Sequence, residues 1–125
     1  MNENDLSNLV INRALKVHTA LGPGLLESSY KECLFYELRQ TGLFVEKEKA
    51  LPLVYGEVKL ECGYRVDLMV ERKLVIETKA VELISDVYLA QVLTYLRLSG
   101  CRLGLLLNFN VKSLRSGIRR VVNGL

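Results

Sequence analysis

The sequence predicts an α/β domain in which helices flank a central mixed β-sheet, and three observations lead to that class. Apolar residues recur at helical spacing through residues 4–42. From residue 43 to residue 81 the apolar pattern changes to that of strands. A helical segment then separates two strongly apolar strands, and such a crossover makes the two strands parallel neighbours. The expected order is two helices, three strands, a helix and a strand.

The first two elements are predicted helices. Residues 4–22 place apolar side chains on one helical face and end at Gly22-Pro23, and residues 25–42 repeat the pattern and stop at Gly42. The Gly-Pro-Gly stretch between them lacks the lysine and the preceding strand of a phosphate-binding loop. We therefore interpret it as a bend between two helices.

Three strand-like segments follow the helices. They cover residues 43–55, 57–70 and 73–81, with Gly56, the Cys62-Gly63 pair and the charged turn 71–73 as interruptions. The remaining elements are a helix at 85–100, with Ser85 as its cap and Gly100 as its end, and a strand at 101–110. That strand has no polar alternation, which is typical of a central strand covered on both faces. The tail, 113–125, fits either a short helix or an edge strand.

Length and composition favour a single cytoplasmic domain that spans residues 1–125. Charges interrupt every apolar stretch before it reaches the length of a membrane span, so no membrane association is expected. The polar, acidic start of the chain is unlike a secretory leader. The three cysteines are widely spaced and form no CxxC pair, so we expect buried apolar residues rather than disulfides or a zinc site.

The net charge is only +3, but the basic residues are unevenly distributed. No acidic residue follows Asp86, and this segment holds Arg97, Arg102, Lys112, Arg115, Arg119 and Arg120. Such a segment predicts a basic face that neutralises phosphates. The same distribution also fits an ordinary solvated surface.

Three charged residues interrupt the apolar strands and are the candidate active-site group. Glu77 and Lys79 share one face of their strand, and antiparallel pairing through the turn 71–73 would bring Asp67 beside Glu77. Adjacent carboxylates repel each other unless a cation lies between them, and Mg²⁺ binds one or two carboxylates together with water and phosphate oxygens. Lys79 could then hold a water molecule or stabilise charge on phosphorus. The alternative is a surface ion pair between Glu77 and Lys79 on a solvated strand.

Three motifs resemble those of a known group. The stretch VDLMVERKLVIETKA, residues 66–80, resembles the D…(D/E)-x-K motif of the PD-(D/E)XK nuclease superfamily. GLLESSY, residues 24–30, matches the G-x-x-E-x-x-Y signature of the small bacterial GxxExxY proteins, a branch of that superfamily. QVLTY, residues 91–95, is similar to the Q-x-x-x-Y motif of RecB-type nucleases. The resemblance implies the restriction-endonuclease-like core, a mixed sheet flanked by helices.

The resemblance also implies a role for each matching residue. Asp67 and Glu77 would bind the metal ion, Mg²⁺ with Mn²⁺ as its substitute, together with the backbone carbonyl of Thr78. Lys79 would be the catalytic lysine, and Glu27 would reach the metal ion or its water. Thr78 departs from the family pattern, because an apolar residue is usual at that position.

Four further residues have weaker assignments. Tyr30, one helical turn from Glu27, would border the same cleft. Gln91 and Tyr95 would support Lys79 or contact nucleic acid, although a core tyrosine beside an amide fits equally well. His18 matches a histidine that RecB-type nucleases use as a metal ligand, but a packed or capping residue is the simpler interpretation.

The predicted function is metal-dependent phosphodiester hydrolysis by attack of a metal-activated water, with DNA favoured over RNA as substrate. A chain this short has little surface for reading bases, so we expect recognition of structure or ends, by a homodimer. The first alternative is a non-catalytic nucleic-acid-binding or protein-interaction module that retains the nuclease fold. A hydrolase or binder for a different ligand also stays open, because a fold does not determine a substrate.

Overall fold

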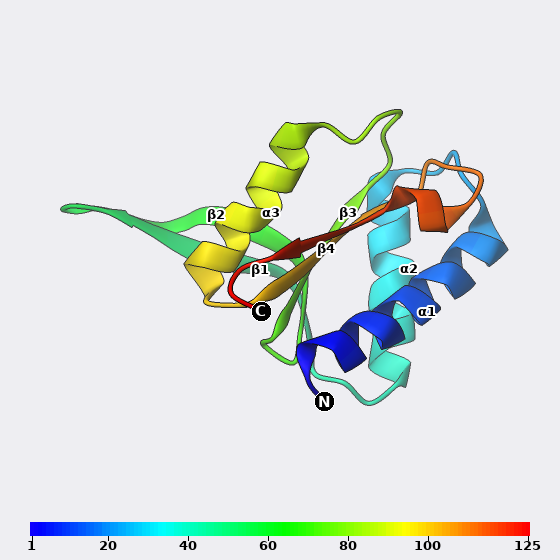
Figure 1. Cartoon of the computed structure of the whole chain (residues 1–125), viewed down its shortest axis with the longest axis horizontal. Coiled ribbons are helices and arrows are strands. Elements are labelled where there is room, and N and C mark those ends of the chain that lie inside the picture. The colour runs from blue at the N-terminus through cyan, green and yellow to red at the C-terminus, as the bar shows by residue number, and fades with distance from the viewer.

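The computed structural model describes residues 1–125 except for the side chain of Cys62. Five strands form one sheet in the order β1-β2-β3-β4-β5, with helices on both faces (Figure 1). The strands are β1 (Val45–Tyr55), β2 (Val58–Val70), β3 (Leu74–Lys79), β4 (Leu103–Asn108) and β5 (Ile118–Val122). All neighbours are antiparallel except β3 and β4, which are parallel. The predicted α/β class, the mixed sheet and the crossover are thus confirmed.

Three α-helices accompany the sheet: α1 (Glu3–Leu21), α2 (Glu27–Gln40) and α3 (Asp86–Ser99). The side chain of Asn2 accepts a hydrogen bond from the Asp5 N–H and caps α1. Ser85 occupies the predicted N-cap position of α3, but its side chain makes no capping hydrogen bond. Gly100 ends α3 in the left-handed conformation that favours glycine. No helix within the described part of the chain combines the length and the apolar character needed to cross a bilayer.

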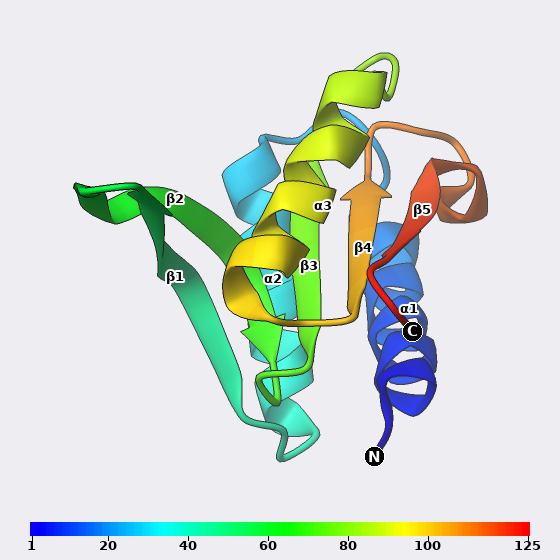
Figure 2. The same cartoon turned by 60° about the vertical axis from the view of Figure 1, so that its left-hand side comes forward.

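The two faces of the sheet have separate cores. Leu74 and Ile76 of β3 pack with residues of α1 and α2, whereas Val75 packs with residues of α3. Figure 2 shows α3 on one side of the sheet and α1 and α2 on the other. Every residue of β4 is buried, which confirms that this strand is covered on both faces. A β-carbon at Gly104 would lie 2.7 Å from the Val92 side chain, so glycine lets α3 pack closely over β4.

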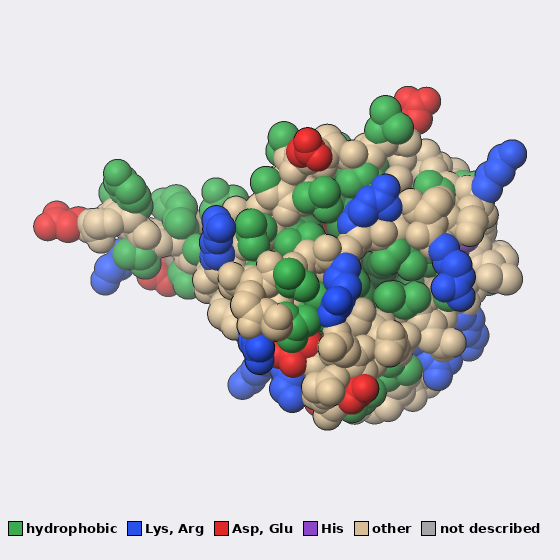
Figure 3. Space-filling view, in the orientation of Figure 1, with side chains coloured by type: hydrophobic (Ala, Val, Ile, Leu, Met, Phe, Trp, Pro, Cys, Tyr) green, Lys and Arg blue, Asp and Glu red, His purple; other side chains and the backbone are tan. Residues whose placement is uncertain are grey.

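The β1–β2 hairpin continues beyond the rest of the sheet as a projecting arm (Figure 1). β2 pairs with β3 only from Leu68 to Val70, and its first part pairs with β1 alone. The strand continues through residues 62–63, where an interruption was predicted, and the irregularity appears instead as a register shift between Leu51 and Leu53. Hydrophobic side chains are exposed along this arm (Figure 3).

The chain end contains both structures that the sequence left open. A 3₁₀ turn, η1 (Leu114–Gly117), precedes the edge strand β5. Of the cysteines, Cys101 is buried as predicted and Cys33 is only partly buried. The prediction for Cys62 lies outside the described side chains.

Candidate active site

Asp67 and Glu77 lie where β2 and β3 separate. The last backbone pair of the β2–β3 ladder on this side is Leu68 with Ile76, and Asp67 and Glu77 come next in register. The Asp67 N–H donates to Oε1 of Glu77 at 3.4 Å, and the Thr78 N–H donates to Oδ2 of Asp67 at 2.9 Å. Side-chain carboxylates therefore accept backbone protons at the point where the β2–β3 ladder ends.

Thr78 gives Asp67 a second hydrogen-bond donor. Its hydroxyl donates to the same Oδ2 atom at 2.9 Å, and the side chain is completely buried. Two donors on one oxygen determine the direction of the carboxylate, because a charged acceptor forms strong hydrogen bonds. The departure from an apolar residue at this position therefore has a structural reason that the sequence did not show.

Burial dominates the electrostatics of Glu77. Its side chain is only 7% exposed, and this burial raises its pKa to about 7, with the charge of Asp67 acting in the same direction. The charge of Lys79 and the hydrogen bond from Asp67 lower the pKa, and the more distant charge of Glu27 raises it. Without a cation, Glu77 therefore carries a proton during part of its time at neutral pH.

Lys79 lies beside Glu77 at the carboxyl end of β3. Its Nζ atom is 3.7 Å from Oε2 of Glu77 and 4.7 Å from the centre of the Tyr88 ring. An ammonium over an aromatic face is attracted to the ring electrons, so Tyr88 helps to hold the lysine. The sequence analysis missed Tyr88, because no motif or spacing connects it with Lys79.

Asn108 anchors the segment that follows Lys79. Its side-chain oxygen accepts from the Val81 N–H at 3.0 Å and its amide donates to the Val81 carbonyl at 2.9 Å. The Phe109 N–H also donates to the Lys79 carbonyl at 2.9 Å. Asn108 was missed too, although a polar residue in the otherwise apolar run 103–109 was an available signal.

Glu27 and Tyr30 have different surroundings, although they lie one turn apart on α2. Glu27 is exposed, and its charge contributes to the raised pKa of Glu77. Tyr30 is fully buried and stacks on Phe109 with the ring centres 4.6 Å apart. Its hydroxyl donates to the Gly22 carbonyl at 2.5 Å and accepts from the Leu25 N–H at 3.1 Å. The prediction that Tyr30 borders the cleft is therefore wrong, and Tyr30 instead holds the bend that precedes Glu27.

Gln91 and Tyr95 of α3 also differ in burial. Tyr95 is buried and meets Tyr64 of β2 edge to face, with ring centres 6.0 Å apart. Burial raises the pKa of Tyr95 to about 12, and the charges of Glu77 and Asp67 add to that shift. Tyr95 therefore lies near the two acids, whereas Gln91 is exposed on the helix surface.

His18 is a packing residue. Its Nε2 atom lies 2.8 Å from the Val111 carbonyl oxygen, so this nitrogen must donate and has no lone pair for a metal ion. The ring is buried, with its centre 6.2 Å from that of Phe109. Among the described side chains, no three histidine, cysteine or acidic residues come together, so Glu27 does not join Asp67 and Glu77 in one cluster.

The basic residues after Asp86 do not form one rim around the acids. Arg97 and Arg102 lie at the end of the sheet where β3 and β4 begin, opposite the end that carries Lys79. Arg119 of β5 is in register with Leu106, which is in register with Glu77, so Arg119 is two strands, or about 10 Å, from Glu77. Only part of the predicted basic segment is therefore near the candidate site.

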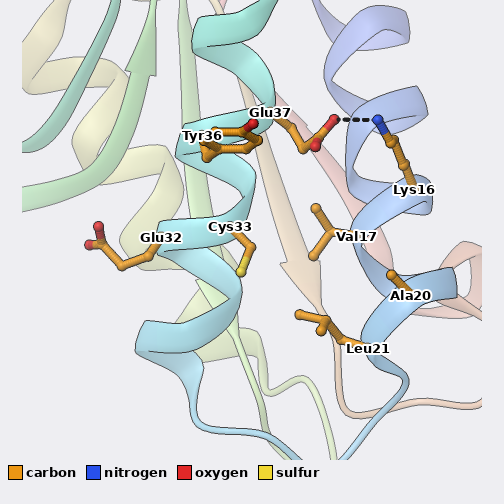
Figure 4. Close-up of a pocket in the computed structure, with 8 residues that line it drawn as sticks. All are labelled: Lys16, Val17, Ala20, Leu21, Glu32, Cys33, Tyr36 and Glu37. Atoms are coloured by element: carbon orange, nitrogen blue, oxygen red, sulfur yellow. Dashed lines mark ion pairs between the residues drawn. The ribbon is translucent and has the colours of Figure 1, made fainter.

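A groove of about 330 Å³ between α1 and α2 is separate from this site (Figure 4). Apolar side chains such as Val17 and Leu21 line it, and the Lys16–Glu37 ion pair crosses it. It lies on the face of the sheet opposite α3, and Glu77 and Lys79 are on the α3 face. The groove therefore has no part in the chemistry of the two acids.

The fold and the site define an α/β protein with two carboxylates and a lysine at the edge of an antiparallel ladder, a side-chain set suited to metal-dependent hydrolysis. The model of the PD-(D/E)XK nuclease superfamily matches residues 4–121, and the chain belongs to this superfamily. The match confirms the resemblance to the superfamily and the restriction-endonuclease-like core. Nucleases of this superfamily generally use divalent metal ions and act on nucleic acid. Comparisons with curated proteins and with solved structures gave no match.

Proposed function

We propose that the protein is a metal-dependent nuclease that hydrolyses phosphodiester bonds in DNA and, as a second choice, in RNA. The observation that carries the proposal is the placement of two carboxylates beside Lys79: the Asp67 N–H donates to Glu77, and the Thr78 N–H donates to Asp67. Superfamily membership supports it independently. We further propose that the chain is a member of the GxxExxY branch, since it carries that signature at residues 24–30.

The donor atoms suit a hard divalent cation. Asp67, Glu77 and the Thr78 carbonyl would supply oxygen ligands, and Mg²⁺ takes one or two carboxylates and completes its shell with water and phosphate oxygens. A third acidic side chain is therefore not required. The raised pKa of Glu77 shows that its ionised form lacks a sufficient counter-charge, which a bound cation would provide. Mn²⁺ would substitute for Mg²⁺.

The bound cation would activate a water molecule and neutralise charge on the phosphate. Lys79, held over Tyr88, would orient the attacking water or stabilise the charge that develops on the phosphate oxygens. Glu27 would act through a water molecule, because it lies outside the acidic pair. Tyr95 would support the acids from α3, and Gln91, which is exposed, would contact the substrate.

Nucleic acid would approach from the α3 side of the sheet, where Arg119 lies in line with Glu77. Lys112 and Arg115 follow the carboxyl end of β4, the end that also carries Lys79. These three cations would contact phosphates. We also propose a homodimer, because a single short chain offers little surface for recognition.

Two substitutions test the function. Asp67→Asn keeps the shape of the side chain but removes a charge needed for the metal ion, and Lys79→Ala removes the amine with its aliphatic stem but no metal ligand. Both should abolish most cleavage of plasmid, single-stranded and branched substrates in Mg²⁺ or Mn²⁺ and retain the fold, and EDTA should stop the wild type. If the wild type and both variants behave alike across this panel, the protein is a binding module that retains the nuclease fold.

A further inference from the structure

Two ion pairs connect α2 with β1, and their lysine side chains differ in burial. Lys31 of α2 pairs with Glu48 of β1 at 2.9 Å, and Glu32 of α2 pairs with Lys47 of β1 at 2.7 Å. The Lys31 side chain is 14% exposed and that of Lys47 is 33% exposed. A more buried charge is less screened by water and salt, so the charge of Lys31 acts over a longer distance than that of Lys47.

Glu48 occupies an unusual backbone position next to Asp67. Its φ angle is 52°, in the left-handed region that residues other than glycine rarely adopt. Lys47 is in register with Leu68 and Lys49 with Val66, so the residue between them on β2 is Asp67. A non-glycine residue in this region is strained, and strain of this kind tends to occur at functional sites. The Glu48 carboxylate accepts a hydrogen bond from the Lys31 ammonium.

Lys31 lies on the same face of α2 as Glu27, because the two residues are four positions apart. Burial opposes ionisation of the Lys31 amine, but its hydrogen bond to Glu48 and the charge of Asp67 together raise its pKa above the usual value. The two acids are thus influenced by different lysines. Lys79 lies 3.7 Å from Glu77, whereas Lys31 pairs with Glu48 and acts on Asp67 only through its charge.

We propose that Lys31 is a charge-balancing residue of the candidate metal site and that Glu48 determines how much of the Lys31 charge reaches Asp67. The inference rests on the proposed metal-dependent function. Lys31 would offset the repulsion between the acids before the cation binds, and it would also oppose the cation electrostatically. The two members of one ion pair would therefore change metal affinity in opposite directions.

Titration with Mn²⁺, followed by electron paramagnetic resonance at low ionic strength, tests this inference. Lys31→Met should tighten Mn²⁺ binding by about fivefold, the effect of one unit charge on a divalent ion several ångströms away in a water-like dielectric. Glu48→Gln should weaken it, because the full charge of Lys31 then acts on the site. Both shifts should shrink at high salt, and Lys31→Arg should behave like the wild type.

Lys47→Met and Glu32→Gln are matched controls, since they break the neighbouring pair between the same two elements. They should leave Mn²⁺ affinity nearly unchanged. If Lys31→Met and Glu48→Gln both weaken binding, or neither changes it, the pair is purely structural and the inference is wrong. Asp67→Asn separates the two proposals. If the wild type binds Mn²⁺ no better than this variant, the metal-dependent function fails, and the inference about Lys31 fails with it.

Discussion

Asp67 and Glu77 are linked in both directions across the point where β2 and β3 part. The N–H of Asp67 donates to the Glu77 carboxylate, and the N–H of Thr78, the residue after Glu77, donates to the Asp67 carboxylate. Each acid thus stabilises the backbone of the opposite strand through one oxygen, and the second oxygen of Glu77 lies 3.7 Å from the Lys79 amine. This arrangement holds two acidic side chains together at the end of the β2–β3 ladder.

Substitution of Thr78 by valine should loosen Asp67 without removing any charge. The change deletes the hydroxyl donor but keeps the backbone N–H and the shape of a β-branched residue. Loss of one buried hydrogen bond to a charged acceptor should lower the free energy of unfolding by about 2 kcal/mol and also weaken Mn²⁺ binding. Urea unfolding and Mn²⁺ titration measure the two effects.

Thr41→Val is the matched control for this substitution. The Thr41 hydroxyl donates to the Leu38 carbonyl at the end of α2, in a hydrogen bond that involves neither acid. This variant should lose stability while its Mn²⁺ affinity stays at the wild-type value. Equal Mn²⁺ affinity in wild type and Thr78→Val would show that the hydroxyl does not orient Asp67.

Glu77 should make the metal-free protein less stable as the pH rises. Its pKa is about 7 when folded and 4.5 ordinarily, so between these values the folded state holds a proton that the unfolded state has released. Stability should therefore fall from pH 4.5 to pH 7. Glu77→Gln should stabilise the metal-free protein at pH 8 by an amount on the order of 3 kcal/mol, and the gain should disappear near pH 4.

Thermal unfolding of both proteins across this pH range, with EDTA and then with Mg²⁺, measures the effect. Saturating Mg²⁺ should reverse the order at pH 8, because a ligand that binds the folded wild type stabilises it. A Glu77→Gln variant that is no more stable than the wild type at pH 8 in EDTA would mean that the buried carboxylate is well compensated without a cation.

The alternation of side chains in a strand was sufficient to place the central group. The short turn 71–73 and the shared face of alternate residues predicted that Asp67 and Lys79 lie near Glu77. In the structure the Asp67 N–H contacts the Glu77 carboxylate, and the Lys79 amine is 3.7 Å from it. The helical and strand periods likewise gave the order of the elements. These are local properties, and a sequence displays them directly.

Contacts between distant segments could not be predicted in this way. Tyr30 was assigned to the cleft from its position near Glu27, but its ring packs on Phe109, which is 79 residues away in the sequence. The left-handed φ angle of Glu48 follows no sequence rule, and neither does its ion pair with Lys31. The clustering of basic residues in the sequence was also misleading, because the length of β4 separates Arg97 and Arg102 from the end of the sheet that carries Lys79.

Tyr88 should support catalysis through its ring rather than its hydroxyl. Its ring lies beneath the Lys79 amine, and an interaction of this kind contributes about 0.5–2 kcal/mol. Tyr88→Ala should therefore lower kcat by roughly threefold to thirtyfold, while Tyr88→Phe should stay near the wild type. Steady-state cleavage at saturating Mg²⁺ measures this. Tyr36→Ala, which removes an exposed ring from α2, is the control.

Loss of the Tyr30 hydroxyl should disturb the bend before Glu27 and leave the ring stack intact. Tyr30→Phe removes the bonds to the Gly22 carbonyl and the Leu25 N–H, so stability should fall by about 1–3 kcal/mol. Amide hydrogen exchange should rise across residues 22–26 more than in the strands. Uniform exchange throughout the chain would indicate a general loss of stability instead.

Arg119 and Arg97 should differ in their contribution to DNA binding, because one lies beside the acids and the other at the opposite end of the sheet. Arg119 is in line with Glu77 through Leu106, and it is exposed on the edge strand β5. Arg97 is also exposed, but it lies in the last turn of α3.

Each phosphate contact adds close to one unit to the slope of log K against log salt concentration. Arg119→Ala should therefore weaken binding of a catalytically inactive Asp67→Asn protein and reduce that slope by about 1, whereas Arg97→Ala should leave both values unchanged. Fluorescence anisotropy with a labelled duplex over a range of salt concentrations measures the slope. Equal effects of the two variants would mean that DNA is held by diffuse charge rather than by a path along the α3 face.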